Sequence, residues 1–387
     1  MPRSSATAST LARASASPAE SAREEAVTRG RVRHLRLVPR RRLTVVDVAL
    51  FYGERSGGIR TYLDAKRAWT AQTGAYDHHV ITPHDVPSLR FATPNGYRIP
   101  FGVEALKARL RELEPDVVLL HDPFWAPLGV TRTAHELAAH VVAVHHGSVD
   151  LDAGSVPLPP GLTKPLLRGW FRHAYRDVDA VMSAVPTLRD TGRRADLPLR
   201  FGLEPAFRPR PEEVERGDHV LYVGRLAREK GVIELVAAAA RARTPWELRF
   251  VGSGPLEGLL RERAARLGIA DRLTFHPFVA DREALSRAYA AARVVVMPGA
   301  HETFGLVGYE AAASGARVVC CTTAPSLREI GDLAHAYRPG DVAGLALAIE
   351  TARVAEPDHN AARRLVARST WPAALEAEHA ALARLSG

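Results

Sequence analysis

Residues 43–63 read LTVVDVALFYGERSGGIRTYL and predict a buried strand, a glycine loop and a helix in succession. The strand covers residues 43–50, where a nearly continuous apolar run is typical of a parallel sheet buried on both faces. The loop contains two adjacent glycines, and the helix begins near Ile59. The unit repeats, with further strands separated by helical patterns at residues 78–81, 115–121, 140–145 and 180–183. This alternation predicts an α/β fold with a parallel, doubly wound sheet.

A second alternation of the same kind begins at residues 219–224, after a proline-rich segment. We therefore predict two Rossmann-like domains, because a chain of 387 residues is long enough for two cores and a proline-rich break is typical of a linker. The predicted parts are a disordered basic tail at residues 1–42, a first domain at 43–202, a linker at 203–211, a second domain at 212–368 and a C-terminal helical segment at 369–387.

The positive charge of the chain is concentrated in the tail. Residues 1–42 hold ten arginines and three glutamates, which together contribute +7 of the net charge of +9. The remaining chain is nearly neutral, which argues against a nucleic-acid-binding surface on the domains. Residues 1–30 contain too little apolar surface to offset the entropy of ordering. Two interpretations stay open for the arginines at residues 29–42: a solvated tail, or a peripheral contact with an anionic membrane.

The sequence predicts a location in the cytoplasm, including the inner face of the membrane. No stretch approaches the ~20 consecutive apolar residues that cross a bilayer. The two cysteines, Cys320 and Cys321, are adjacent, and such neighbours rarely form an unstrained disulfide. They end an apolar run, so we expect two reduced and buried thiols.

Two glycine loops suit a phosphorylated ligand. Gly57 and Gly58 lie between a strand and a helix, where backbone N–H groups and the positive end of the helix can hold a phosphate. Arg60 adds a fixed positive charge beside them. Gly252 lies in a second loop of this kind, after the strand at residues 248–251. Each glycine equally suits an ordinary turn, and neither loop has the G-x-G-x-x-G pattern, so no nicotinamide cofactor is expected.

Two cations flank the turn after the strand at residues 219–224. Arg225 and Lys230 stand at the carboxyl end of that predicted strand. There they can clamp a diphosphate and stabilise a departing nucleotide. A solvated basic loop is the alternative interpretation.

Residues 298–310 read PGAHETFGLVGYE and contain two glutamates. Glu302 precedes a predicted helix, and Glu310 lies within it, about two turns further along. One carboxylate can contact a sugar and the other a ribose diol. Unpaired N–H groups at the start of the helix can bind phosphate oxygens, which points to the backbone of Phe304, Gly305 and Leu306. The alternative is an exposed acid and an ordinary helical glutamate, although an unpaired glutamate among small apolar neighbours is costly.

These patterns together resemble the family 4 glycosyltransferases: the spacing of Glu302 and Glu310, the segment from Gly224 to Gly231, and the Gly57–Gly58 loop. The resemblance covers about residues 44–385. It implies the GT-B fold, in which two Rossmann-like domains face one another across a cleft and a final helix crosses back to the first domain. It also implies that no metal or other cofactor is needed beyond the nucleotide-sugar donor.

The resemblance also implies roles for single residues. Arg225 and Lys230 would bind the donor diphosphate, Glu302 the transferred sugar and Glu310 the ribose. Gly58 would approach the phosphate from the first domain. The family's strand that ends in an active-site histidine matches residues 140–147, where His146 is the preferred candidate and His145 remains open.

Residues 50–63 and 302–305 look like bacterial mannosyltransferases that act on glycolipids, which implies GDP-mannose as the donor, with a UDP-sugar as the alternative, and a lipid or glycan hydroxyl as the acceptor. The implied reaction is retaining: the acceptor attacks from the face that the diphosphate leaves, and Glu302 positions the sugar without acting as a nucleophile. Two Asp-x-Asp matches, at residues 150–152 and 177–179, resemble metal-dependent transferases, but neither follows a long apolar strand. We therefore predict no metal site.

Two other classes of function remain open. A sugar-nucleotide epimerase of the same fold would isomerise the donor without an acceptor. A non-catalytic binding protein would bind the nucleotide without turnover. A glycogen-phosphorylase-like enzyme is disfavoured by the length of the chain and by the lack of an evident pyridoxal-phosphate lysine motif.

Overall fold

The computed structural model describes residues 42–52, 57–90, 98–121, 123–155 and 159–386. Residues 42–387 form one compact unit. The predicted tail at residues 1–42 lies outside the described residues except for Arg42, so its predicted disorder stays a prediction.

The first half of the chain builds a parallel six-stranded sheet in the order β2-β1-β5-β6-β7-β8. Its central strands are buried on both faces, as their apolar runs predict. A short antiparallel hairpin, β3–β4, stands apart from it. The strands are β1 (Thr44–Val48), β2 (Asp77–Ile81), β3 (Ser88–Arg90), β4 (Arg98–Pro100), β5 (Val117–Leu120), β6 (His140–His145), β7 (Ala180–Ser183) and β8 (Leu197–Pro198).

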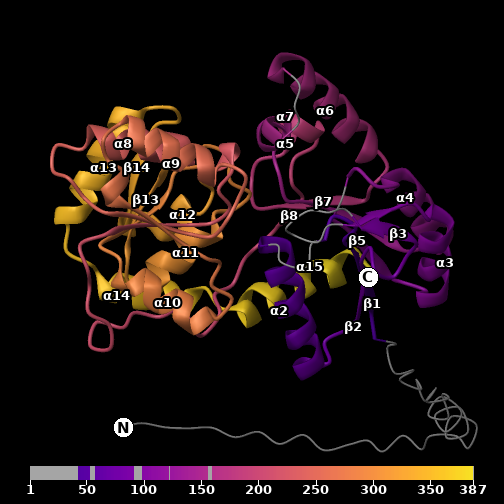
Figure 1. Ribbon diagram of the computed structural model, residues 1–387. Helices are drawn as coiled ribbons and strands as arrows, with labels where there is room; N and C mark the ends of the chain where they lie inside the picture. The colour runs from indigo at the N-terminus through magenta and orange to yellow at the C-terminus, as the bar shows by residue number, and fades with distance from the viewer. Residues whose placement is uncertain (1–41, 53–56, 91–97, 122, 156–158, 387) are drawn as a thin grey trace, which may run out of the picture. The chain divides into compact units, whose positions relative to one another are not determined.

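Helices cover both faces of this sheet (Figure 1). One face packs against α2 and the C-terminal helix α15, and the other against α3, α4 and α6. The helices are α2 (Gly58–Thr73), α3 (Val103–Leu113), α4 (Pro127–Glu136), α5 (Val149–Ser155), α6 (Pro160–Ala174), α7 (Leu188–Thr191) and α15 (Trp371–Leu385).

The second half forms another parallel six-stranded sheet, in the order β11-β10-β9-β12-β13-β14. Two parallel sheets with helices on both faces confirm the predicted α/β class (Figure 1). The strands are β9 (Val220–Val223), β10 (Leu248–Val251), β11 (Leu273–His276), β12 (Val294–Met297), β13 (Arg317–Cys321) and β14 (Ala334–Tyr337).

One face of the second sheet packs against α8, α9 and α13, and the other against α10, α11 and α14. The helices are α8 (Val232–Arg241), α9 (Glu257–Arg266), α10 (Arg282–Ala291), α11 (Leu306–Ala313), α12 (Leu327–Ile330), α13 (Val342–Val354) and α14 (His359–Arg368), with short 3₁₀ turns η1 (Arg228–Lys230), η2 (Ala270–Arg272) and η3 (Gly331–Leu333). Both cysteines are buried free thiols in β13, as expected.

Several boundaries differ from the prediction. Helix α4 begins at Pro127, because proline suits the first turn, where its missing N–H costs nothing. Helix α5 was not predicted, and it places Asp150 and Asp152 on a helix. The segment at residues 203–211, predicted as a linker, contacts α10 through Arg210. Arg210 within it is 2% exposed and donates hydrogen bonds to Ser286 Oγ (2.6 Å) and to the carbonyl of Ala206 (2.9 Å).

None of the described helices combines the length and the apolar character needed to cross a bilayer.

Candidate active site

An ion pair joins the two loops that the sequence singles out in the second sheet. Lys230 lies in η1 after β9, and Glu302 lies in the loop after β12, so they follow neighbouring strands. Lys230 Nζ lies 2.8 Å from Glu302 Oε2 and 3.0 Å from Oε1. Carboxyl ends of parallel strands meet at one edge of the sheet, which is why residues 72 positions apart come together. Both side chains are largely buried, at 28% and 10% exposed.

Backbone geometry holds this pair in place. Gly231 has a φ of +68°, and a Cβ there would lie 2.5 Å from the carbonyl oxygen of Pro298. A Cβ at Gly299 would lie 2.8 Å from Glu302 Oε1. The two glycines therefore let the loop after β9 approach the loop after β12, which only residues without a side chain permit.

Arg225 takes a different position from Lys230. Its guanidinium pairs with Glu229 within the same loop, and half of the side chain is exposed. The carbonyl of Arg225 accepts a hydrogen bond from the Tyr222 hydroxyl at 2.8 Å, which anchors the backbone of this loop. The Arg225 side chain is thus half exposed, whereas the Lys230 side chain is largely buried against Glu302.

Glu310 has a set of partners separate from that of Glu302. It is 7% exposed in α11, and its Oε1 lies 2.5 Å from Arg282 Nη2 at the start of α10. The Tyr289 hydroxyl lies 3.3 Å from its other oxygen. Burial raises the pKa of Glu310 to about 7, against the opposing effect of Arg282. The sequence argument that a buried glutamate needs a partner is satisfied, because Arg282 pairs with Glu310. The sequence analysis did not identify Arg282 as that partner.

The other predicted donor-binding residues lie at loop–helix junctions. Gly305 has a φ of +95° and caps α11, whose first residue is Leu306, while Phe304 is buried against Phe201 with ring centroids 4.7 Å apart. Gly57 caps α2, which begins at Gly58, and a Cβ at Gly58 would lie 3.3 Å from Leu306 Cδ1.

Arg60 and Gly252 each have a local structural explanation. The exposed Arg60 side chain pairs with Asp64 one turn along α2, at 3.3 Å. Gly252 has a φ of +130°, and a Cβ there would lie 2.2 Å from the carbonyl oxygen of Gly224. A close backbone approach therefore requires this glycine.

The two adjacent histidines have different environments. His145 ends β6 and packs edge-on against Phe171 and Tyr175 in the core, where burial lowers its pKa to about 4. His146 follows the strand, is partly buried, and contacts His121 through a 2.6 Å N···N hydrogen bond. Burial, and after it the neighbouring His121 and His145, hold the pKa of His146 well below its usual range.

Comparisons with known proteins match both halves of the chain. A family model described as Glycosyltransferase Family 4 matches residues 56–199, and one described as Glycosyl transferases group 1 matches residues 217–353. A GDP-mannose-dependent alpha-mannosyltransferase of Mycolicibacterium smegmatis is 31% identical over 76% of this chain and 80% of its own length. The chain belongs to family 4 of the glycosyltransferases.

Two further comparisons support this assignment. A GDP-mannose-dependent alpha-(1-6)-phosphatidylinositol dimannoside mannosyltransferase of Mycobacterium tuberculosis is 28% identical over 74% of this family 4 chain and 81% of its own length. Sucrose-phosphate synthase from Thermosynechococcus elongatus matches in structure with a TM-score of 0.71, covering 89% of this chain and 99% of that one at 22% identity. The fold of this glycosyltransferase is therefore GT-B, as predicted.

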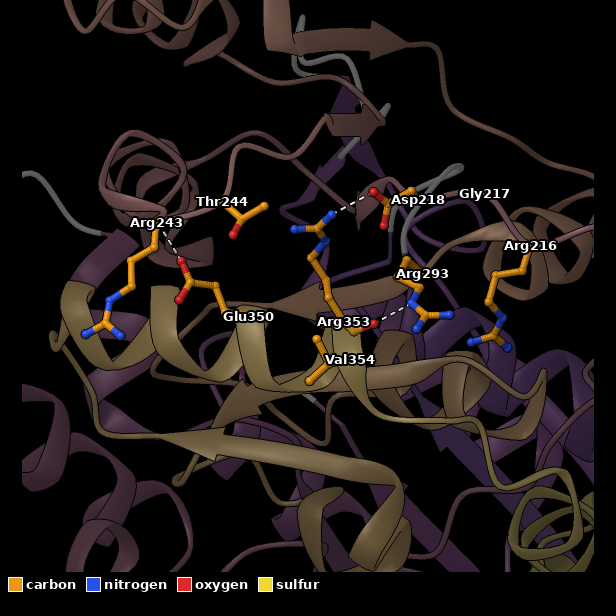
Figure 2. A pocket seen from close by; sticks show the side chains of 9 residues that line it. All are labelled: Arg216, Gly217, Asp218, Arg243, Thr244, Arg293, Glu350, Arg353 and Val354. Atoms are coloured by element: carbon orange, nitrogen blue, oxygen red, sulfur yellow. Dashed lines mark hydrogen bonds and ion pairs between the residues drawn. The ribbon is translucent and has the colours of Figure 1, made fainter.

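A basic cavity of about 640 Å³ in this glycosyltransferase lies at the opposite edge of the second sheet (Figure 2). Its lining comes from segments just before β9, β10 and β12 and from the end of α13, and it includes Arg216, Arg243, Arg293 and Arg353. Acids accompany these arginines. Arg353 pairs with Asp218 at 2.7 Å, and Glu350 accepts a 2.5 Å hydrogen bond from the backbone N–H of Arg243. This cavity is therefore separate from the Lys230–Glu302 pair.

The two Asp-x-Asp matches have structural roles. Asp150 pairs with Lys164 at 2.6 Å, and Asp179 accepts a 2.7 Å hydrogen bond from the backbone N–H of Val141. Within the part of the chain that the structure describes, no group of three or more His, Cys, Asp or Glu side chains is arranged to hold a metal ion.

Proposed function

We propose that this family 4 glycosyltransferase moves mannose from GDP-mannose to a hydroxyl of a lipid or glycan acceptor, with retention of anomeric configuration. The observation that carries the proposal is the Lys230–Glu302 ion pair at the carboxyl edge of the second sheet. A cation and a carboxylate side by side suit the two halves of a sugar diphosphate, because the cation stabilises the diphosphate and the carboxylate accepts hydrogen bonds from sugar hydroxyls.

The proposed roles follow from the environments of the residues. Lys230 holds Glu302 in position before the donor arrives, and the donor diphosphate then shares Lys230 with it. Arg225, whose side chain is half exposed, supplies a second positive charge that stabilises the departing diphosphate. Glu310 accepts hydrogen bonds from the ribose, and the backbone at Gly305 and Leu306 holds phosphate oxygens.

In the proposed reaction the sugar–phosphate bond breaks as positive charge develops on the sugar. The acceptor hydroxyl attacks from the face that the diphosphate leaves, and its proton passes to the leaving phosphate. The charges of Arg225 and Lys230 stabilise the diphosphate that leaves. Two relatives are named for GDP-mannose-dependent alpha-mannosyl transfer, which supports both the donor and the retention, since GDP-mannose is itself an α-glycosyl phosphate.

The test is donor hydrolysis and binding across GDP-mannose, UDP-glucose, UDP-N-acetylglucosamine and UDP-galactose. Wild type is compared with Glu302→Gln and Lys230→Ala, and the exposed pair Glu262–Arg266 on α9 supplies matched controls, Glu262→Gln and Arg266→Ala. We expect slow release of GDP from GDP-mannose, reduced about 100-fold or more in both site variants, as for loss of one stabilising group at a reacting centre.

Each rival function predicts a different result. An isomerised nucleotide sugar without acceptor would indicate an epimerase. Tight binding without turnover would indicate a non-catalytic binding protein. Turnover of another donor would overturn the assignment of mannose but leave the glycosyltransferase site intact.

A further inference from the structure

A row of polar side chains crosses the buried face of the first sheet beneath α2 and α15. His78 lies in β2, Asp47 in β1, His121 directly after β5 and His146 directly after β6. These four strands are neighbours in the order β2-β1-β5-β6. The row therefore leads from the interior of the sheet to its carboxyl edge, where His146 ends it.

Two short hydrogen bonds connect the last three members of the row. Asp47 Oδ1 lies 2.6 Å from His121 Nε2, and His121 Nδ1 lies 2.6 Å from His146 Nε2. The two imidazole rings are within 17° of parallel, with centroids 4.9 Å apart. With an N···N contact this short, such a centroid separation places the rings edge to edge, which is the geometry of an in-plane hydrogen bond rather than of stacking.

The charged groups around the row are paired with one another within the core. Asp47 is fully buried, and its other oxygen lies 2.9 Å from Lys66 Nζ and 2.7 Å from His78 Nε2. Lys66, also fully buried, reaches Glu378 of α15 at 2.7 Å. Burial raises the pKa of Asp47, but Lys66 and then His121 and His78 outweigh it, so the pKa lies well below the usual range.

This arrangement determines which atoms of the histidines carry protons. An ionised carboxylate only accepts hydrogen bonds, so the proton between Asp47 and His121 belongs to His121 Nε2. In neutral His121 the Nδ1 atom then accepts, and the N–H that it accepts belongs to His146 Nε2. The remaining nitrogen of His146, Nδ1, is left with a lone pair that can accept a hydrogen bond.

We propose that Asp47 and His121 are positioning residues that fix the tautomer of His146, so that His146 Nδ1 accepts a hydrogen bond from a sugar hydroxyl during transfer. This proposal rests on the proposed function. The hydroxyl keeps its proton in this contact: His146 Nδ1 orients it by accepting the hydrogen bond, and no N–H or O–H bond breaks.

A purely structural role would explain the pairing of Asp47, Lys66 and Glu378 but not the extension to His146. A buried carboxylate needs a cation and hydrogen bonds, and Lys66 with His78 already supplies both. His121 is 5% exposed, and its two ring nitrogens form hydrogen bonds with Asp47 and with His146. The experiment must therefore separate the contact with His146 from the stability of the core.

The test uses two substitutions of His121 in the full chain. His121→Asn keeps an amide oxygen near the position of Nδ1, where it can accept the His146 Nε2–H. His121→Gln places its amide near the position of Nε2, toward Asp47, and loses the contact with His146. We expect kcat/KM to fall about 10–100-fold for Gln and much less for Asn, as when the hydrogen-bond partner of a functional histidine is removed. His140→Asn, at the opposite end of β6, is the matched control.

A double-mutant cycle then shows whether His121 acts through His146. In a His146→Ala background, His121→Gln should cost less than about threefold, because the contact it removes is already absent. Costs that multiply in the double variant would overturn the proposal in favour of a structural role. So would equal losses for Asn and Gln in proteins whose free energies of unfolding match wild type.

The pH profile provides a further readout. The titratable and charged groups that face the two histidines are Asp47, His78, His145, Tyr62, Lys66 and Glu378. As pH falls, a proton on the pair turns His146 from an acceptor into a donor. An acidic limb of kcat/KM should therefore appear in wild type and move to higher pH in His121→Asn, because after burial His121 is the next group that lowers the pKa of His146 and a neutral amide does not. A limb unchanged in His121→Asn would contradict the proposal.

A spectroscopic measurement distinguishes failure of this proposal from failure of the proposed function. The side-chain ¹⁵N shifts of His146, assigned by their loss in His146→Ala, report its tautomer without any substrate. We expect the Nε2–H tautomer near neutral pH in wild type and a mixture of tautomers in His121→Gln. If no nucleotide sugar turns over but this shift pattern is found, the proposed transfer reaction is wrong, while the role of Asp47 and His121 in fixing the tautomer of His146 stands. The same mixture of tautomers in both proteins would overturn that role.

Discussion

Glu310 shows how one buried carboxylate couples affinity to pH. Its pKa is raised from 4.5 to about 7 by burial. On the proposed function the ionised form accepts hydrogen bonds from the ribose. We expect donor affinity to fall about fivefold between pH 8 and pH 6, because a hydrogen bond to a charged acceptor is worth roughly 1 kcal/mol more than one to a neutral acceptor.

The measurement is calorimetric titration of GDP-mannose, whose diphosphate is a diester and does not titrate in this range. The Glu310→Gln variant should bind more weakly at pH 8 and show a flat profile. A slope that persists in this variant would assign the titration to another group.

The stability of the apo protein should follow the opposite trend. Because the folded-state pKa of Glu310 lies above its value of 4.5 in the unfolded chain, its contribution is fully present below about pH 4.5 and is lost as pH rises through about 7. The free energy of unfolding of wild type relative to Glu310→Gln should therefore decrease over this interval. Urea titrations of both proteins at pH 5 and pH 8 measure the difference.

At the scale of elements, the loop after β10 depends on the absence of a side chain at Gly252. Its φ of +130° and the carbonyl of Gly224, 2.2 Å from a Cβ, leave no room for one. We expect Gly252→Ala to lower the free energy of unfolding by about 2–3 kcal/mol through overpacking and backbone strain. Gly258→Ala in α9 is the control, since nothing lies within 4 Å of a Cβ there. It should be neutral or stabilise by about 0.5 kcal/mol.

The junction of α2, β1 and α15 rests on one buried lysine. Lys66 is fully buried between Asp47 and Glu378, and the Tyr62 hydroxyl donates to Glu378 at 2.6 Å. Removing the cation leaves the carboxylates of Asp47 and Glu378 in the core without a neighbouring lysine. We therefore expect Lys66→Met to lower the free energy of unfolding by about 3–5 kcal/mol.

Chemical denaturation at pH 7 and pH 5 measures this penalty. Because the folded-state pKa of Asp47 is lowered, its stabilising contribution is present above its unfolded value of 3.8 and is lost only as pH falls through the folded value. That contribution is intact in wild type at both pH values, but without Lys66 burial raises the pKa of Asp47, so the penalty should be smaller at pH 5 than at pH 7. Lys107→Met, whose partner Glu104 is exposed, is the control and should change stability by less than about 1 kcal/mol. Equal effects of the two substitutions would contradict a buried cation.

At the scale of the whole molecule, most of the net positive charge lies in residues 1–42, and residues 42–387 form a compact unit. We expect residues 42–387 to hydrolyse GDP-mannose within about twofold of the full chain, because all the residues of the proposed site lie within them. Sedimentation with anionic vesicles at low and high salt separates the two interpretations of the tail. Binding by the full chain alone, lost in high salt, would favour membrane contact, since each arginine near such a surface contributes about 1 kcal/mol.

The sequence by itself determined the alternation of strands and helices, because apolar runs of strand length and amphipathic helices follow from local side-chain chemistry. It also predicted that Lys230 follows a strand and that Glu302 precedes a helix, as they do. What it could not supply was the order of the strands. Asp47 and His121 are 74 residues apart and lie in separate segments that each look like an ordinary buried strand.

The sequence nevertheless contains two unusual features that point to the buried charges of Asp47 and Lys66. Asp47 interrupts a valine run, and Lys66 lies on the apolar side of a helix, so each required a buried partner. Only the tertiary structure decided which partners these are. Placing β1 between β2 and β5 brings His78, Lys66 and His121 to one carboxylate, and placing α15 on α2 adds Glu378. Hydrogen bonds and charges act over a few ångströms in space, whereas a sequence records only neighbours along the chain.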